Sequence, residues 1–321
     1  MVAQKKSSGY FQRQPIMRKV LISLIPVAAV ATFLFGLRVL TLTAVVIVAG
    51  SITEYIFAKK RKAKISEAVL VSSVLFTLSL PVATPYWIAV IGIVFGVIFA
   101  KEVFGGYGRN VFNPAIVGRA FIFVSFPEYL TASWNQIATS FPGGFAVYMT
   151  PPLDALTQAT PIALYNQTGN MVSYANILLG NTYGSMGETS VAVLLLGGIY
   201  LVLKKAADWR LMVSPLFGFL VLAGILYLIG VPSVPPPLYG VFTGGFFFLS
   251  IYFVTEPTTA PKTLQGKWIY GISIGMITAI IRYFGIFPEG ATFALLIMNT
   301  FVPIMDEGVK YMKKRRQVKT T

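Results

Sequence analysis

Residues 20 to 37, VLISLIPVAAVATFLFGL, and residues 39 to 58, VLTLTAVVIVAGSITEYIFA, decide the fold class of this chain. Each stretch is almost entirely apolar and close to the roughly 20 residues that an α-helix needs to cross a bilayer. The basic segment KKRKAK follows directly at residues 59 to 64. A long apolar run that ends in a cluster of cations predicts a transmembrane helix whose end lies in the cytoplasm.

The same pattern recurs along the rest of the chain. Eight further apolar runs lie at residues 65–83, 86–104, 114–126, 190–203, 211–230, 238–254, 268–285 and 289–305. The run at 114–126 is short, and a broken or re-entrant course is an alternative for it. Only 12% of the 321 residues are charged, whereas a soluble domain carries roughly 25%. We therefore predict an all-α polytopic membrane protein with about ten transmembrane helices.

The basic residues fall on one side of this arrangement. If the N-terminus is cytoplasmic, 24 of the 26 Lys and Arg residues lie in the tails and the inner connections, and only Arg38 and Arg282 fall toward the outer face. Short loops with excess Lys and Arg stay inside, so both termini are predicted to be cytoplasmic. The net charge of +15 thus indicates topology and attraction to anionic membrane lipid rather than nucleic-acid binding.

The runs divide the chain into two halves around a long loop. One predicted helix begins near Trp87 and contains Gly92 and Gly96, and another begins near Trp268 and contains Gly271 and Gly275. In the predicted topology these two helices cross the membrane in opposite directions. This internal similarity predicts two inverted repeats of five spans each. The predicted segments are a cytoplasmic tail (1–19), the first half (20–126), an extracytoplasmic loop (127–189), the second half (190–306) and a basic cytoplasmic tail (307–321).

The chain contains no Cys and no His. It therefore has no ligands for thiolate-bound iron–sulfur clusters, His-bound haem or the usual zinc sites. A Ser-His-Asp or Cys-His nucleophile is excluded for the same reason. Any redox chemistry must come from a bound organic cofactor.

One motif in the long loop points to such a cofactor. Residues 154 to 160, DALTQAT, resemble the D-x-x-[ST]-G-A-T signature at which a flavin transferase joins the phosphate of FMN to the final Thr hydroxyl. The resemblance implies covalent FMN at Thr160, and Gln158 departs from it because the signature has Gly there. The other matching positions are Asp154, Thr157 and Ala159. Taken alone, the segment also fits a polar turn whose Thr caps a helix.

Two further regions extend the resemblance. Residues 100 to 121 contain AKEVFGGYGRN, FNPA and GRAF, and residues 255 to 306 contain TEP, QGKW, YFG and PEG, with Asn299, Pro303 and Asp306 beyond them. These segments are similar to the NqrB/RnfD family, the flavin-carrying membrane subunits of sodium-pumping NADH:quinone oxidoreductase and of the Rnf ferredoxin:NAD oxidoreductase. Glu256 stands where the family usually has Asp. The short N-terminal tail favours the RnfD branch, whereas the KEVFGG run is closer to NqrB.

The resemblance implies an electron-carrying subunit of a multisubunit redox pump, most similar to RnfD, in the cytoplasmic membrane of a bacterium or archaeon. Electron transfer would be coupled to sodium or proton movement. The chain would not be catalytic alone, and its expected partners are iron–sulfur, NADH-handling and second flavin subunits, together with a flavin transferase. An NqrB-like subunit is the alternative within the family, and a non-redox solute permease or channel is the alternative outside it.

Several polar residues are further candidates for the site. Arg282 and Arg38 are candidate counter-charges for the flavin phosphate, or cations that reach toward outer headgroups. Arg119 and Asn113, with Arg109 beside a Gly-rich loop, are candidates for a second, non-covalent flavin such as riboflavin or for a partner contact. The alternative there is a helix break whose glycines let two backbones approach closely.

The remaining candidates lie inside predicted spans. Intramembrane acids are functional suspects, and Glu54, Glu67 and Glu102 lie near the inner ends of spans. Salt bridges to Lys59, Lys64 and Lys101 are the preferred explanation for them. Asn299 and Thr300 fit an ion path or hydrogen bonds between helices.

Overall fold

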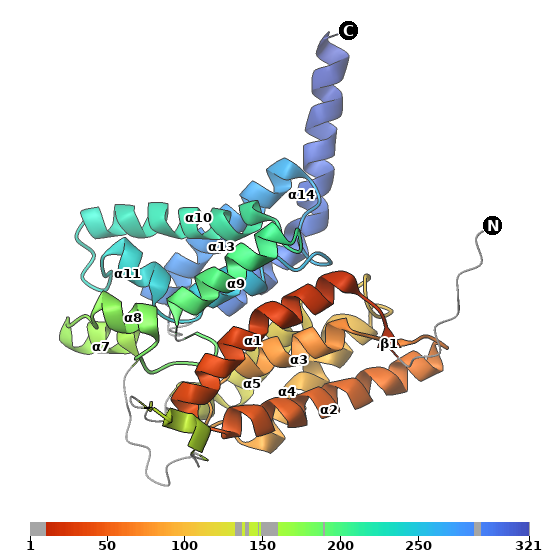
Figure 1. The fold of residues 1–321 in the computed structure, drawn as a ribbon. Helices are drawn as coiled ribbons and strands as arrows, with labels where there is room; N and C mark the ends of the chain where they lie inside the picture. Colours follow the sequence, from red (N-terminus) through yellow and green to blue (C-terminus); the bar gives the residue numbers. More distant parts are fainter. Residues whose placement is uncertain are drawn as a thin grey trace.

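The computed structural model describes residues 11–131, 137–138, 141–146, 148, 160–188, 190–285 and 290–320. Within these ranges the chain is mostly helical (Figure 1), and one short parallel bridge pairs β1 (Phe11–Gln12) with β2 (Ile65–Ser66). The helices of the first half are α1 (Pro15–Phe35), α2 (Arg38–Lys60), α3 (Ala68–Leu78), α4 (Tyr86–Val97) with its π-helical continuation η1 (Ile98–Glu102), and α5 (Pro114–Ser125).

Short helices fill the described parts of the long connection. They are α6 (Pro127–Thr131), the 3₁₀ turn η2 (Gly143–Ala146), α7 (Pro161–Thr168) and α8 (Tyr174–Leu179). The second half contains α9 (Val191–Leu203), α10 (Trp209–Leu228), α11 (Pro237–Phe242), α12 (Phe246–Tyr252), α13 (Leu264–Phe284) and α14 (Gly290–Thr320).

Five of the described helices are long and apolar enough to cross a membrane, namely α1, α2, α10, α13 and α14. Each of the ten predicted runs is occupied by helix, but α3, α5 and α9 have only 11 to 13 residues. The run at 238–254 is divided into α11 and α12, because Thr243 is extended and Gly244 has φ +68°. A multi-pass helical membrane protein is therefore confirmed, whereas the count of ten spans and the inverted repeat stay predictions.

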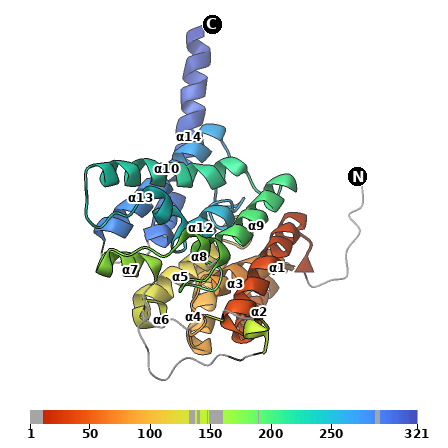
Figure 2. The same ribbon diagram turned by 60° about the vertical axis from the view of Figure 1, so that its left-hand side comes forward.

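The two halves lie side by side (Figures 1 and 2), with α1–α5 in red to yellow and α9–α14 in green to blue. Contacts between the halves are made by α1 against α9 and by α5 against α14. Within the halves, α4 packs on α2 and α5, and α13 packs on α10 and α14. Glycines permit the closest approaches: a Cβ on Gly96 would overlap the Pro114 carbonyl oxygen, and one on Gly275 would overlap that of Pro215.

Charged side chains gather where one set of helix ends meets, which we call the charged end. The N-termini of α1, α3, α5, α10 and α13 lie there with the C-termini of α2, η1, α9 and α12, as the polar contacts between them show. One link is the Lys19 ammonium, which donates to the Lys204 carbonyl at 2.8 Å. The helices α7 and α8 lie at the other end, which we call the loop end (Figure 1).

Candidate functional site

Thr160 is the residue immediately before α7. Its backbone is extended, and its Oγ1 accepts a hydrogen bond from the Ala163 N–H at 3.3 Å, while Pro161 occupies the first helical position. This is the usual chemistry of a helix N-cap. The hydroxyl is the acceptor in this hydrogen bond, so its own hydrogen is not needed for the cap. The other signature positions, Asp154, Thr157, Gln158 and Ala159, lie outside the described residues.

The start of α7 is held against the second half. The Tyr239 hydroxyl donates to the Pro161 carbonyl at 3.3 Å and accepts from the Val172 N–H at 3.2 Å. Tyr239 is fully buried in α11. The segment that begins at Thr160 is therefore hydrogen-bonded to α11.

Arg282 is close to the same region. It is 5% exposed on α13, donates to the Gly240 carbonyl, and lies over the rings of Phe219 and Phe246 at 5.2 and 5.9 Å. A Cβ on Gly244 would contact both Ile162 of α7 at 3.2 Å and the Arg282 guanidinium at 3.5 Å. Arg282 and the first turn of α7 therefore both lie next to Gly244.

Arg38 has a different environment. Its guanidinium is buried and donates to the carbonyls of Val82 and Thr84 at 2.8 and 3.2 Å, and it lies 4.9 Å from the centre of the Tyr86 ring. These bonds satisfy backbone groups in the connection that follows α3. Arg38 therefore stabilises a non-helical segment and does not reach outward to headgroups.

Arg119 lies inside the protein between the two halves. Its guanidinium donates to the Ser79 carbonyl at the C-terminus of α3, and it forms an ion pair with Glu188 at 3.1 Å. Both side chains are nearly fully buried. The carboxylate lies against Gly245, which precedes α12, and a Cβ on this glycine would overlap Glu188 Oε1. The pair therefore bridges the end of one short helix and the start of another.

Glu188 reaches this position because the end of the predicted loop turns back into the protein. The N–H groups of Met186 and Gly187 donate to the carbonyls of Leu80 and Leu78 at 3.0 and 2.6 Å. The sequence predicts that residues 127–189 form a loop outside the membrane, and residues 185–188 near its end are buried within the protein. The one hint in the sequence is that Glu188 is the only acid between Asp154 and Asp208, directly before an apolar run.

Asn113 and Arg119 do not form one site. Asn113 caps α5 by accepting from the N–H groups of Ala115 and Ile116, and it lines a cavity of about 30 Å³ that Glu256 and Tyr252 also line. Arg119 lines a separate cavity of about 10 Å³. Volumes of this size hold about one water molecule, so a second flavin would need more space than these cavities give.

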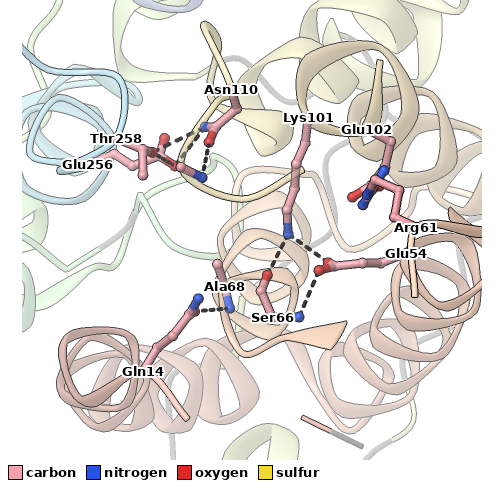
Figure 3. A network of polar contacts seen from close by, with 11 residues as sticks. Gln14, Glu54, Arg61, Ser66, Ala68, Lys101, Glu102, Asn110, Glu256 and Thr258 are labelled. Carbon is pink, nitrogen blue, oxygen red and sulfur yellow. Dashed lines mark hydrogen bonds and ion pairs between the residues drawn. The ribbon is translucent and has the colours of Figure 1, made fainter. Parts of the chain in front are cut away.

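The charged end contains a buried polar network (Figure 3). The Lys101 ammonium donates to Glu54 at 2.7 Å and to the Ser66 hydroxyl at 2.6 Å, and the Ser66 N–H donates to Glu54 at 2.8 Å. Lys101 and Glu54 are each about 3% exposed. Lys101 lies in the π-helical turn η1, a feature that is frequent at functional sites.

The other inner acids are paired as well. Glu102 is fully buried and pairs with Arg61, and Glu67 pairs with Arg18 and accepts from the Gln14 N–H at 2.7 Å. The interpretation of Glu54, Glu67 and Glu102 as salt-bridged acids is therefore confirmed. Their partners are Lys101, Arg18 and Arg61, respectively, so two of the three cations are arginines and not the predicted lysines.

Glu256 lies in the connection between α12 and α13, beside this network (Figure 3). It accepts from Thr258 at 2.9 Å and from Thr259 at 3.3 Å, and the Asn110 amide approaches it at 3.5 Å. Burial raises the pKa of this carboxyl, and these hydrogen bonds only partly offset that effect. It is thus a carboxyl at the charged end that takes up a proton more readily than an exposed glutamate.

Asn299 and Thr300 lie in different environments, one buried and the other exposed. Asn299 is 1% exposed and its side-chain oxygen accepts from the Tyr270 hydroxyl, which is a hydrogen bond between α14 and α13. Its amide nitrogen has no partner among the residues that the structure describes. Thr300 is exposed and its hydroxyl bonds the carbonyl of Ile297 within its own helix, so the structure links only Asn299 to the interior.

Comparison with known proteins places these features in a family. Residues 8–315 match the NQR2, RnfD, RnfE family. The chain is 35% identical over 302 residues to the D subunit of the Na(+)-translocating ferredoxin:NAD(+) oxidoreductase complex of Acetobacterium woodii, covering 92% of this chain and 88% of that relative.

Similar identities are found with the B subunits of Na(+)-translocating NADH-quinone reductases. The chain is 36% identical to that of Pseudomonas aeruginosa, over 84% of this chain and 66% of the relative. It is 37% identical to that of Azotobacter vinelandii, over 87% of this chain and 68% of the relative. The chain thus spans about two thirds of the length of these proteins. The match over nearly the whole chain, together with the identity to both kinds of relative, shows that the protein belongs to the NQR2, RnfD, RnfE family of membrane subunits of ion-translocating oxidoreductases.

Proposed function

We propose that this chain is a flavin-carrying subunit of an Rnf-type complex and that FMN is attached through its phosphate to Thr160. The position of Thr160 before α7 is the observation that carries the proposal. With neither Cys nor His in the chain, a bound flavin supplies the electron chemistry that the side chains lack. Electron transfer in the complex is coupled to movement of sodium ions or protons.

The residues present fit a phosphodiester at this position. The N-terminus of a helix favours negative charge, because its first N–H groups have no partner within the helix. Thr160 is partly exposed, so a transferase can reach its hydroxyl. The hydroxyl oxygen accepts from Ala163 without using its own hydrogen, and esterification at this oxygen does not require the cap to be lost.

Arg282 is the proposed counter-charge for this group. The proposal rests on the shared contact of Gly244 with Ile162 and Arg282, which places a buried guanidinium beside the first turn of α7. A second, non-covalent flavin is not part of the proposal because the cavities beside Asn113 and Arg119 are too small for it.

An NqrB-like role is the second candidate, since the identity to the quinone-reductase relatives is as high as that to the ferredoxin-linked relative. The match to the ferredoxin-linked relative extends over more of this chain, 92% against 84 to 87%, which favours the Rnf type. Purification of the complex from native membranes distinguishes the two. A ferredoxin-reactive complex supports the Rnf type, and an NADH-quinone reductase supports the alternative.

Flavin attachment is tested by fluorescence on a denaturing gel. Native protein is expected to give a flavin band that is lost in Thr160→Ala and retained in Thr160→Ser. Thr168→Ala is the matched control, because Thr168 is an exposed threonine at the other end of α7. A band that survives Thr160→Ala places the flavin elsewhere. The absence of covalent flavin from native membranes contradicts the proposal and favours a permease.

A further inference from the structure

A groove of about 570 Å³ lies at the charged end. Thr255 and Pro257 in its lining are the sequence neighbours of Glu256, which Figure 3 labels. It runs between the connection from α9 to α10 and the connection from α12 to α13. Its charged lining consists of four cations and one acid: Lys205, Arg210, Lys262, Lys267 and Asp208. The lining therefore carries a net charge of +3, from four positive charges and one negative charge.

The single acid of the lining, Asp208, already interacts with two of the four cations. Asp208 Oδ2 accepts from Lys267 at 2.7 Å, and Asp208 Oδ1 lies 3.5 Å from Arg210 Nη1. Burial opposes the charged form of this carboxyl, but the hydrogen bonds from Lys267 and from the Arg210 N–H outweigh it and hold its pKa below the usual range. The ammonium groups of Lys205 and Lys262 have no carboxylate partner within the described part of the chain. The Asp306 carboxylate also lies close by, since it accepts from the N–H groups of Lys262 and Thr263 at 2.9 and 3.0 Å. Positive charge still exceeds negative charge around the groove.

Trp209 lines the groove, and other exposed apolar side chains are close to the lining residues along the chain. Trp209 begins α10, is 45% exposed, and meets Trp268 of α13 edge to face with ring centres 6.1 Å apart. Trp side chains at helix ends are typical of the membrane–water interface. Leu203 and Leu264, at the ends of α9 and α13, are 75% and 51% exposed. Lys205 and Lys262 are therefore each two residues along the chain from an exposed leucine that is suited to contact acyl chains.

We propose that this groove binds the headgroup phosphate of an anionic phospholipid, with Lys205 and Lys262 contacting the phosphate and the acyl chains lying over Leu203 and Leu264. The cytoplasmic leaflet attracts Lys and Arg through its anionic lipids, and the positive-inside rule places the charged end there. The exposed apolar side chains favour a lipid over a soluble anion, because a free phosphate makes no use of exposed Leu and Trp side chains.

The test compares the full-length protein with two double variants of equal charge. Native mass spectrometry after reconstitution in phosphatidylcholine containing phosphatidylglycerol counts the phosphatidylglycerol molecules retained. Lys205→Gln with Lys262→Gln is expected to weaken retention about tenfold. Lys313→Gln with Lys314→Gln removes the same charge from the exposed end of α14 and is expected to leave retention unchanged. Unchanged thermal unfolding of both double variants shows that they fold.

Three results would overturn the proposal. Equal phosphatidylglycerol retention by the groove variant and the native protein removes the groove as the site. Displacement of the lipid by millimolar inorganic phosphate shows a site for a free anion. Loss of a partner protein from the purified complex, with lipid retention unchanged, shows a contact for an acidic protein surface instead.

Discussion

Lys101 and Glu54 form an ion pair in which each side chain is only about 3% exposed and the ammonium also donates to Ser66. Removal of one partner from such a pair leaves an uncompensated charge in a medium of low dielectric constant. We expect Lys101→Met or Glu54→Gln alone to lower the free energy of unfolding by ~3–5 kcal/mol. Thermal unfolding in one detergent measures the loss.

The double variant Glu54→Gln with Lys101→Met should be more stable than either single variant, because no unpaired charge remains. The exposed pair of Lys310 and Glu307 is the control, and Lys310→Met should cost less than about 1 kcal/mol. A double variant as unstable as the sum of the two single variants would show that the two side chains act independently.

Glycines decide how closely the helices approach. A Cβ at Gly96 of α4 would overlap a backbone oxygen of α5, which cannot rotate away as a flexible side chain can. Gly96→Ala is therefore expected to separate α4 from α5 and to lower the unfolding temperature measurably. Gly308→Ala on α14 is the matched control, since nothing lies within 4 Å of its Cβ position, and it should be neutral or slightly stabilising. Equal effects of the two substitutions would contradict this account.

Hydrophobic runs predicted the elements well because a bilayer span requires a long apolar stretch. They did not predict where helices stop inside such a run. At the end of α3, the Arg119 guanidinium and the Gly187 N–H donate to the carbonyls of Ser79 and Leu78. Before the break at Gly244, the Arg282 guanidinium donates to the Gly240 carbonyl. Contacts of this kind join distant parts of the chain and leave no periodic pattern in it.

The candidate site, like the helices, was predictable from the sequence only in part. The motif located Thr160, and the structure adds that it precedes α7 and that Arg282 contacts the same glycine as α7 does. The sequence groups Asn113 with Arg119, and in the structure the N-cap Asn113 and Arg119 of α5 line different cavities. Glu188 was not singled out, since a polar loop gives no sign that its last residues turn inward.

The orientation of the whole molecule is open to a direct experiment because the chain has no cysteine. A single cysteine at Lys313, on the exposed end of α14, should react with a membrane-impermeant maleimide only in inverted vesicles. A cysteine at Asn170, exposed between α7 and α8, should react only in intact cells. These outcomes follow from the positive-inside rule. The reverse labelling pattern would place the threonine proposed to carry flavin in the cytosol.

The buried turn that ends in Glu188 has a mechanical consequence. Its backbone is bonded to α3 in the first half, and its carboxylate meets Arg119 of that half and Gly245 of the second. The same stretch of chain continues back through α8 to the residues around Thr160. These hydrogen bonds and the ion pair go to the first half, so rocking of one half against the other would move Gly245 relative to the carboxylate. The turn thus connects the loop end to the boundary between the two halves.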